Sequence, residues 1–132
     1  MTRSESPTDS FDYAAAAARL LDIARKRSIR NAGLFDQATQ DCRGIIGMIR
    51  SIYRPSRIYQ WGSLLDRRRF DENSDIDIGV EGLAAPEQIF ALCTAAERMT
   101  KFPLHIIELE KIHPVYAESI RRRGKLVYER PK

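Results

Sequence analysis

The sequence predicts an α/β (α+β) domain, with a small mixed β-sheet and flanking helices, that is preceded by an N-terminal helical extension. Apolar residues recur every three or four positions in several segments, which is the spacing of one face of a helix. After residue 56 these segments alternate with short runs of β-branched and aromatic residues, which are typical of strands. The composition, 43% hydrophobic and 30% charged over 132 residues, is that of a single folded domain and excludes a disordered chain.

Two helices are expected ahead of the sheet. The first begins near the capping residues Asp9 and Ser10, contains the alanine run at 14–18, and stops at Asn31-Ala32-Gly33. The second covers 34–51, where apolar side chains again share one face. The chain is thereby divided into a disordered lead-in at 1–10, a helical extension at 11–38 and the main domain at 39–132.

The remaining elements follow a break at Arg54-Pro55-Ser56. They are a strand at 57–61, a short helix at 64–70, a strand at 75–80, a helix at 86–100, a strand at 104–109, a helix at 113–123 and a last strand at 126–128. The strand at 75–80 has the clearest pattern, because polar and apolar residues alternate along Asp-Ile-Asp-Ile-Gly-Val. This alternation places Asp75 and Asp77 on one face of the sheet and leaves the isoleucines to enter the core.

Charged and aromatic residues elsewhere give weaker indications. The net charge of +4 is compatible with a phosphate-bearing ligand but gives only weak support to nucleic acid as a partner. Basic clusters at 25–30, 67–69 and 121–123 are interpreted first as solvated surface. Trp61 could stack a nucleotide base, but its place on a central strand favours packing in the core.

Cysteine usage and hydropathy restrict the cellular setting. Cys42 and Cys93 lie in apolar, helix-like segments without the spacing of a zinc site, which indicates reduced thiols. No apolar run approaches the ~18 residues that a membrane span needs. The polar segment 1–10 lacks the apolar core of a secretory signal. We therefore expect a cytoplasmic protein without a membrane partner.

The strongest chemical signal joins Gly62-Ser63 to the pair Asp75 and Asp77. Two neighbouring carboxylates repel each other unless a cation neutralises them, and Mg²⁺ prefers such oxygen ligands while leaving positions for phosphate oxygens. Gly62 lets the backbone approach a ligand, and the Ser63 hydroxyl can bond a phosphate oxygen. Metal ligands on one strand and a phosphate-binding turn after its neighbour predict a site for nucleotidyl transfer, with a nucleoside triphosphate as substrate.

The same residues resemble a known family. Tyr59-Gln60-Trp61-Gly62-Ser63 and Ser74-Asp75-Ile76-Asp77-Ile78-Gly79-Val80 are similar to the core motif of the DNA polymerase beta-like nucleotidyltransferase superfamily, and most of all to its minimal nucleotidyltransferases, the MNT proteins. The resemblance implies a nucleotidyltransferase fold over most of the chain, with Gly62 and Ser63 on the nucleotide phosphates and the two aspartates on Mg²⁺. Many MNT proteins are antitoxin partners of HEPN ribonucleases, and some transfer AMP from ATP to a tyrosine of that partner.

The chain departs from the family at a third acidic position. The family often places an aspartate on the next strand, and the alignment of that strand puts His105 there. Three interpretations of His105 stay open: a substitute catalytic base, the mark of a site that binds nucleotide but transfers it slowly or not at all, or a residue without consequence because two aspartates suffice. Glu108 lies three positions later and should face the other side of the strand.

The resulting hypothesis is a magnesium-dependent nucleotidyltransferase with Asp75, Asp77 and His105 as candidate catalytic residues. It moves a nucleoside monophosphate, with AMP from ATP favoured, to a hydroxyl on a protein partner, which in a toxin–antitoxin pair is a HEPN-type toxin. The alternative is a binding module of the same fold, weak or inactive in catalysis, that regulates its partner by contact. The acceptor, the base of the nucleotide and any homo-oligomer are left undetermined by the sequence.

Overall fold

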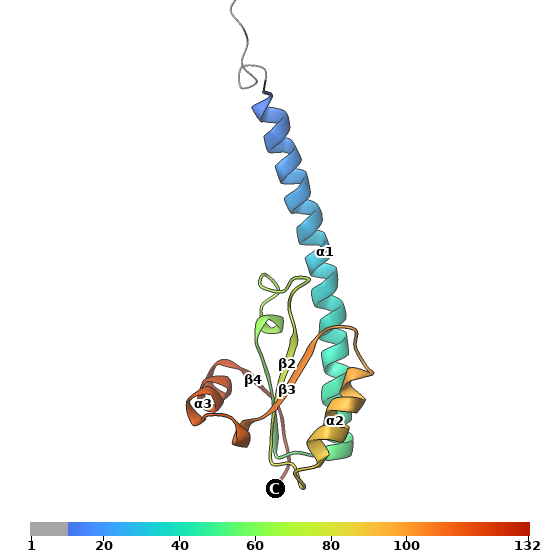
Figure 1. Cartoon of the computed structure of the whole chain (residues 1–132), viewed down its shortest axis with the longest axis vertical. Helices are drawn as coiled ribbons and strands as arrows, with labels where there is room; N and C mark the ends of the chain where they lie inside the picture. Colours follow the sequence, from blue (N-terminus) through green and yellow to red (C-terminus); the bar gives the residue numbers. More distant parts are fainter. Residues whose placement is uncertain (1–10) are drawn as a thin grey trace, which may run out of the picture.

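The structure, a computed structural model, describes residues 11–132, which form one mixed sheet and three α-helices (Figure 1). The predicted lead-in at 1–10 lies outside the described residues. The helices are α1 (Tyr13–Met48), α2 (Gln88–Glu97) and α3 (Pro114–Arg123), and the strands are β1 (Arg57–Trp61), β2 (Ile76–Glu81), β3 (Leu104–Glu108) and β4 (Lys125–Glu129). No helix in this part of the chain is long and apolar enough to cross a membrane.

A single long helix, α1, replaces the two helices expected at the N-terminus. It starts at Tyr13, where the Asp12 carboxylate accepts a hydrogen bond of 2.9 Å from the Ala15 amide. The predicted stop at Asn31-Ala32-Gly33 is wrong, since the helix passes through it without interruption. A glycine inside a helix costs only about 1 kcal/mol relative to alanine. Burial of Ala38 and of the turns after it in the core outweighs that cost.

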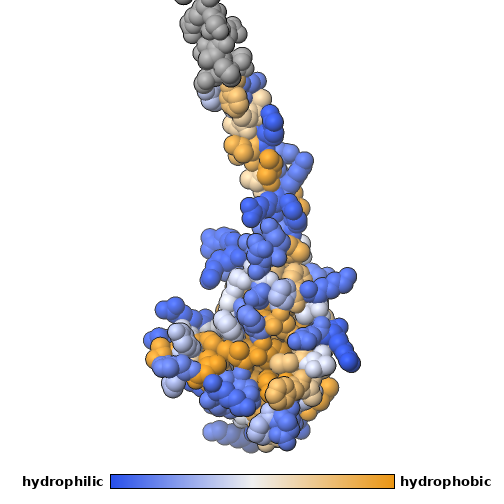
Figure 2. Space-filling view, viewed as in Figure 1, coloured by the Kyte–Doolittle hydropathy of each residue, from blue (hydrophilic) through white to orange (hydrophobic). Residues whose placement is uncertain are grey.

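The first half of α1 projects from the rest of the molecule as an arm, defined here as residues 13–30 (Figure 1). Its side chains are almost all exposed, including the apolar Leu20, Leu21 and Ile29, of which about two thirds of the surface is open to solvent. Figure 2 shows apolar and charged groups side by side along the arm. The second half of the same helix buries Ala38, Cys42 and Ile45. One helix therefore supplies both a core element and a surface without intramolecular cover.

Helix α1 ends at the break that the sequence predicts. A π-helical turn at Ile49–Tyr53 extends it, and Arg54 then adopts the left-handed conformation, with a φ of 46°. Pro55 follows and cannot continue a helix. The chain is thereby turned into β1.

The sheet has the strand order β3-β2-β1-β4. Strand β1 pairs antiparallel with both β2 and β4, whereas β2 and β3 are parallel, so the prediction of a small mixed sheet is confirmed. The register sets Asp77 of β2 opposite Trp61 of β1 on one side and opposite His105 of β3 on the other. The pairing alone brings these three residues, which are distant in sequence, into one row.

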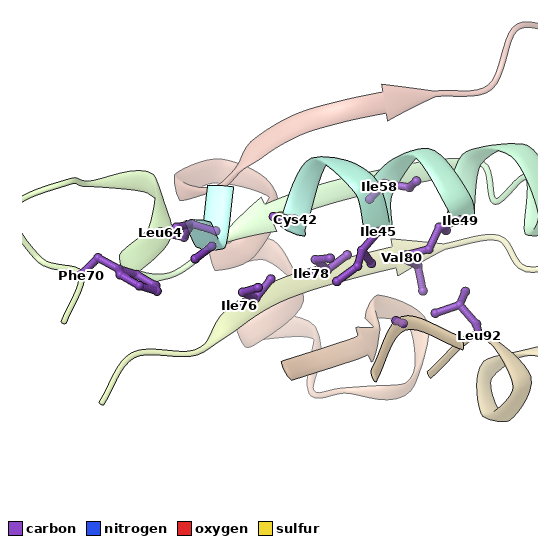
Figure 3. Close-up of a cluster of buried hydrophobic side chains, with 12 residues drawn as sticks. Cys42, Ile45, Ile49, Ile58, Leu64, Phe70, Ile76, Ile78, Val80 and Leu92 are labelled. Atoms are coloured by element: carbon purple, nitrogen blue, oxygen red, sulfur yellow. The ribbon is translucent and has the colours of Figure 1, made fainter. Parts of the chain in front are cut away.

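Helices cover the two faces of the sheet unequally (Figure 1). Helices α1 and α2 pack on one face, where the main core forms. Figure 3 shows the side chains of this core between α1, the strands and α2: Cys42, Ile45, Ile49, Ile58, Leu64, Phe70, Ile76, Ile78, Val80 and Leu92. A smaller apolar cluster beneath α3, with Tyr59, Leu109 and Ala117 at its centre, covers part of the opposite face. Beyond this cluster the second face carries a row formed by Trp61, Asp77 and His105.

The segment between β1 and β2 differs from the expected short helix at 64–70. Only a 3-10 turn at Ser63–Leu65 forms, and the chain then runs through turns. The Asp66 carboxylate accepts a hydrogen bond of 3.0 Å from the Arg68 amide, and the Asp71 carboxylate accepts one of 2.9 Å from the Asn73 amide. Such local bonds satisfy backbone groups in a non-helical conformation and so compete with a helix.

The continuity of α1 through Gly33 can be tested by Gly33→Ala. An added Cβ meets no atom within 4 Å, so we expect the free energy of unfolding to rise by up to about 1 kcal/mol, measured by urea denaturation. Gly47→Ala, also unobstructed in the same helix, is the matched control and should stabilise similarly. A destabilising Gly33→Ala alongside a stabilising Gly47→Ala would indicate that the helix does stop at residue 33.

Candidate functional site

Asp75, Asp77 and His105 meet at one end of the open sheet face. Asp75 immediately precedes β2 and Asp77 lies within it, so their side chains leave the same face. The Nδ1 atom of His105 is 3.4 Å from Asp77 Oδ1 and 3.7 Å from Asp75 Oδ2. One ligand atom from each residue lies within 4.8 Å of the others. The structure thus brings the three predicted catalytic residues together.

Burial makes the charge of Asp77 costly. Only 8% of this residue is exposed, and burial is the main cause that raises the pKa of its carboxyl above the usual range. The neighbouring charge of Asp75 raises this pKa further, while His105 acts in the opposite direction. A cation bound between the two aspartates would offset both the cost of burying the Asp77 charge and its repulsion by Asp75. Such a pair of carboxylates is therefore electrostatically suited to a metal ion.

Gly62 fits closely against Asp77. Its backbone has a φ of 83° and a ψ of −161°, a region that is essentially restricted to glycine. A Cβ at this position would collide with Oδ2 of Asp77. The absence of a side chain at Gly62 therefore leaves the space that the buried carboxylate of Asp77 occupies. The motif thereby brings the Gly62-Ser63 turn and the strand that carries Asp77 close together.

Ser63 follows Gly62 and begins the 3-10 turn at the end of β1. It is half-buried, one residue from the Gly62 backbone that touches Asp77. Because the expected helix is reduced to this single turn, its macrodipole is small, and phosphate binding would rest on the turn itself and on the Ser63 hydroxyl. Their roles as phosphate ligands stay a prediction.

Glu108 lies on the opposite side of β3 from His105, as the strand alternation predicts. It sits near α2, where its charge contributes, after burial and Glu97, to raising the pKa of the Cys93 thiol. Its carboxylate is 3.0 Å from the Lys111 ammonium. Glu108 therefore cannot serve as a third carboxylate of the cluster, and the imidazole of His105 alone takes that place on β3.

Two of the basic clusters hold arginines with structural partners. Arg67 is 2.8 Å from Asp36 and lies over the ring of Phe35, and Arg121 donates to Glu81 across 2.8 Å. These contacts tie the 66–70 segment to α1 and tie α3 to the sheet. They favour the interpretation of these residues as structural surface groups over that of a nucleic-acid interface.

The side chains of the cluster fit a divalent cation. Two carboxylates at ligand distance from each other, one of them buried, are a donor set suited to Mg²⁺. The imidazole nitrogen of His105 is a weaker ligand for this ion, which prefers oxygen. Asp75 and Asp77 are therefore the residues that would hold Mg²⁺, and His105 would stand beside it.

Comparisons with known proteins agree with the fold. The family model described as "Polymerase beta, Nucleotidyltransferase" matches residues 45–132, two thirds of the chain. A chain in the crystal structure of the toxin–antitoxin complex MntA-HepT is similar in fold, with a TM-score of 0.51 and 21% identity over 69% of this chain and 72% of that one. A chain from a double mutant of such a complex gives a TM-score of 0.53 and 22% identity over 67% and 72%. No curated protein matches in sequence.

Replacement of Gly62 by alanine should damage both the backbone and the cluster. The left-handed φ and the collision with Asp77 predict a loss of about 2 kcal/mol in the free energy of unfolding, measured by urea denaturation. The alanine should also displace the carboxylate and weaken Mg²⁺ binding measured by isothermal titration calorimetry. Gly47→Ala, which meets nothing, is the control. Unchanged stability of Gly62→Ala would contradict the close contact.

Asp77→Asn should stabilise the metal-free protein. The amide removes a buried charge and its repulsion by Asp75, so we expect a gain of about 1 kcal/mol in unfolding free energy in the presence of EDTA. Asp75→Asn, whose side chain is 34% exposed in the native protein, should change stability less. Loss of stability in Asp77→Asn would mean that contacts of the carboxylate outweigh the cost of burying it.

Proposed function

The chain belongs to the polymerase beta nucleotidyltransferase family, and we propose that it transfers a nucleoside monophosphate from a triphosphate, ATP by preference, to a hydroxyl of a protein partner. The observation that carries the proposal is the contact between the two halves of the motif. Gly62 of the phosphate-binding turn touches Asp77, and Asp77 lies beside Asp75. A triphosphate on the turn would therefore have its reacting phosphorus beside the two carboxylates.

The transfer requires one bond to form and one to break. The acceptor oxygen attacks the α-phosphorus, the bond from that phosphorus to the bridging oxygen of the β-phosphate breaks, and pyrophosphate leaves. Asp75 and Asp77 would hold Mg²⁺ beside the reacting phosphate, while Ser63 binds the departing phosphates. Magnesium, when bound by the two aspartates, supplies charge neutralisation and polarisation of the phosphate.

His105 is the residue of this site that we assign to the proton of the acceptor hydroxyl. Its side chain is 64% exposed, so an acceptor can reach it, while Nδ1 is directed to the carboxylates at 3.4 and 3.7 Å. Histidine is the side chain that most often serves as a general base in enzymes. This assignment favours the interpretation of His105 as a substitute base over the two others.

The acceptor is proposed to arrive on a toxin-type protein partner in the cytoplasm. The similar solved structures are toxin–antitoxin complexes, and the fold likeness suggests the same kind of partner for this chain. The catalytic face beyond α3 is open, and the exposed arm of α1 offers a second surface to a protein. In this setting the chain would act as the antitoxin of a HEPN-type ribonuclease.

A second candidate is regulation of the partner by contact alone. It is motivated by His105, because a nitrogen ligand in place of a third carboxylate binds Mg²⁺ less well. Under this alternative the site holds nucleotide, and the partner is neutralised without modification.

The test is incubation with Mg²⁺, α-³²P-labelled ATP and a purified HEPN-type ribonuclease as the candidate partner. We expect label on the ribonuclease and a loss of at least about 100-fold in initial rate for Asp75→Asn/Asp77→Asn, because both metal ligands are removed. His105→Ala should lower the rate about 100-fold if it accepts the proton, with His113→Ala, which caps α3, as the control histidine.

Three outcomes separate the alternatives. No labelled partner, or labelling undiminished in the double aspartate variant, would contradict transfer at this site. A double variant that still neutralises the ribonuclease in cells would support regulation by contact. Undiminished transfer by His105→Ala would show that the two aspartates suffice.

A further inference from the structure

The positive charge of the molecule is concentrated in the arm of α1. Five side chains of the arm are basic and one is acidic, an excess that equals the net charge of +4 of the whole chain. The rest of the sequence is therefore balanced in charge. Arg19, Arg25 and Arg30 are exposed on the arm, whereas Lys26 lies 3.0 Å from Asp22. The arm is thus a cationic helix on a body without net charge.

An apolar stripe runs along one face of the arm. We define the stripe by Tyr13, Ala17, Leu20 and Ala24, whose spacings of four, three and four residues are those of one helix face. Ala17 and Ala24 precede the buried Ala38 by whole heptads, so the stripe continues the face of α1 that packs on the sheet. The core covers this face in the second half of the helix, whereas all four residues of the stripe are exposed.

A small cavity lies where the stripe meets the body. Its volume is about 360 Å³, and its lining includes Ala24 and Arg27 of α1 together with Arg67 and Arg68 of the segment after β1. Each arginine already contacts one acidic residue of the chain, and the side chain of Arg68 is still 93% exposed. A guanidinium group has five N–H donors, so it can bind a further carboxylate. The stripe therefore ends at a site suited to acidic side chains.

The tip of the arm adds aromatic surface. The rings of Phe11 and Tyr13 pack edge to face with their centroids 4.8 Å apart, and more than half of each residue is exposed. Aromatic and arginine side chains are enriched among the residues that carry most of the binding energy at protein interfaces. The arm therefore has the composition of a protein-binding surface.

The charge of the arm decides what can cover the stripe. A second copy of the chain, paired along the same stripe, would bring two cationic helices together, and like charges at short distance repel each other. An acidic surface would instead be attracted. The small side chains of Ala17 and Ala24 favour a helix as the covering element, because the distance between packed helices depends on the side chains at their contact.

We propose that the arm is the docking element for the protein partner, and that this partner presents an apolar α-helical surface bordered by aspartate and glutamate side chains. The stripe packs on the apolar part, while Arg25, Arg30 and Arg68 pair with carboxylates at its edges. The inference rests on the proposed function, because it takes the docked partner to be the protein that carries the acceptor hydroxyl. It goes further by assigning partner recognition to a segment outside residues 45–132, which the family model matches.

Leu20→Glu and Ile29→Glu are the matched substitutions that test the stripe. Both residues are 67% exposed, and both variants add one negative charge to the arm. Nine residues separate the two positions, which places Ile29 on the helix face opposite the stripe. Binding of the full-length protein to the HEPN-type ribonuclease of the labelling assay is measured by calorimetry. We expect Leu20→Glu to weaken binding at least about tenfold and Ile29→Glu to weaken it less than about threefold.

The charge of the arm is tested by Arg25→Gln/Arg30→Gln. The control, Arg43→Gln/Arg98→Gln, removes two positive charges from exposed positions of the body. We expect only the first pair to lower the association rate, about fivefold by biolayer interferometry, and to reduce its dependence on NaCl concentration, because the arm attracts an acidic partner at long range. An unchanged association rate for the first pair would overturn the acidic character of the partner.

The labelling assay separates docking from chemistry. Leu20→Glu should raise the KM for the ribonuclease about tenfold and leave kcat unchanged, since the arm contributes binding alone. Asp75→Asn/Asp77→Asn should bind the ribonuclease as tightly as the wild type and transfer label at least about 100-fold more slowly.

The other outcomes would overturn the proposal. Unchanged affinity of Leu20→Glu, or equal weakening by Leu20→Glu and Ile29→Glu, would overturn docking through the stripe and leave the proposed transfer standing. A wild-type dimer in analytical ultracentrifugation that Leu20→Glu dissociates would identify a second copy as the occupant. Binding to vesicles of phosphatidylcholine and phosphatidylglycerol that Leu20→Glu abolishes would identify a lipid surface instead. A wild-type protein that binds no ribonuclease would overturn the docking and the proposed acceptor together.

Discussion

The buried charge of Asp77 is the constraint on which the rest of the site depends. Burial to 8% exposure beside a second carboxylate makes the charged form of Asp77 less favourable than it would be in water, and a bound cation would offset that cost. The fold holds it there through the sheet, because Ile76 and Ile78 anchor the same strand in the core from the opposite face. The antiparallel partner then brings Gly62 against the carboxylate, and the parallel partner brings His105. This arrangement lowers the stability of the fold, and such a loss is typical of functional sites.

The strands and the cluster could be predicted from the sequence because their signals are local. Alternation along 75–80 fixes the face of both aspartates, and the parallel register of β2 and β3 sets His105 opposite Asp77. The break at 31–33 and the helix at 64–70 were wrong for the opposite reason. At Gly33 a weak local preference is overridden by packing further along α1, and at 66–73 side-chain bonds to the backbone replace the helix.

Other features have no sequence signal at all. The contact of Gly62 with Asp77 depends on two strands meeting at one register, and the cavity at the base of the arm depends on how the segment after β1 meets α1. The motif predicts a phosphate at Gly62 because glycine lets the backbone approach a ligand closely. It gives no sign that the Asp77 carboxylate is the group that excludes a side chain at this position.

The unbroken course of α1 sets a geometric condition on any protein that contacts both the arm and the sheet face that carries Asp75 and Asp77. At 1.5 Å per residue, the arm from Tyr13 to Arg30 extends roughly 27 Å. The arm is continuous with the part of α1 that lies against the sheet, so its direction relative to the sheet face that carries Asp75 and Asp77 is fixed by the core and not by a hinge. A protein that lies along the arm and also presents a hydroxyl to Asp75 and Asp77 must be large enough to reach from the arm to these two carboxylates. The fixed arm therefore selects protein partners by size. A small hydroxyl-bearing molecule that reaches the carboxylates makes no contact with the arm.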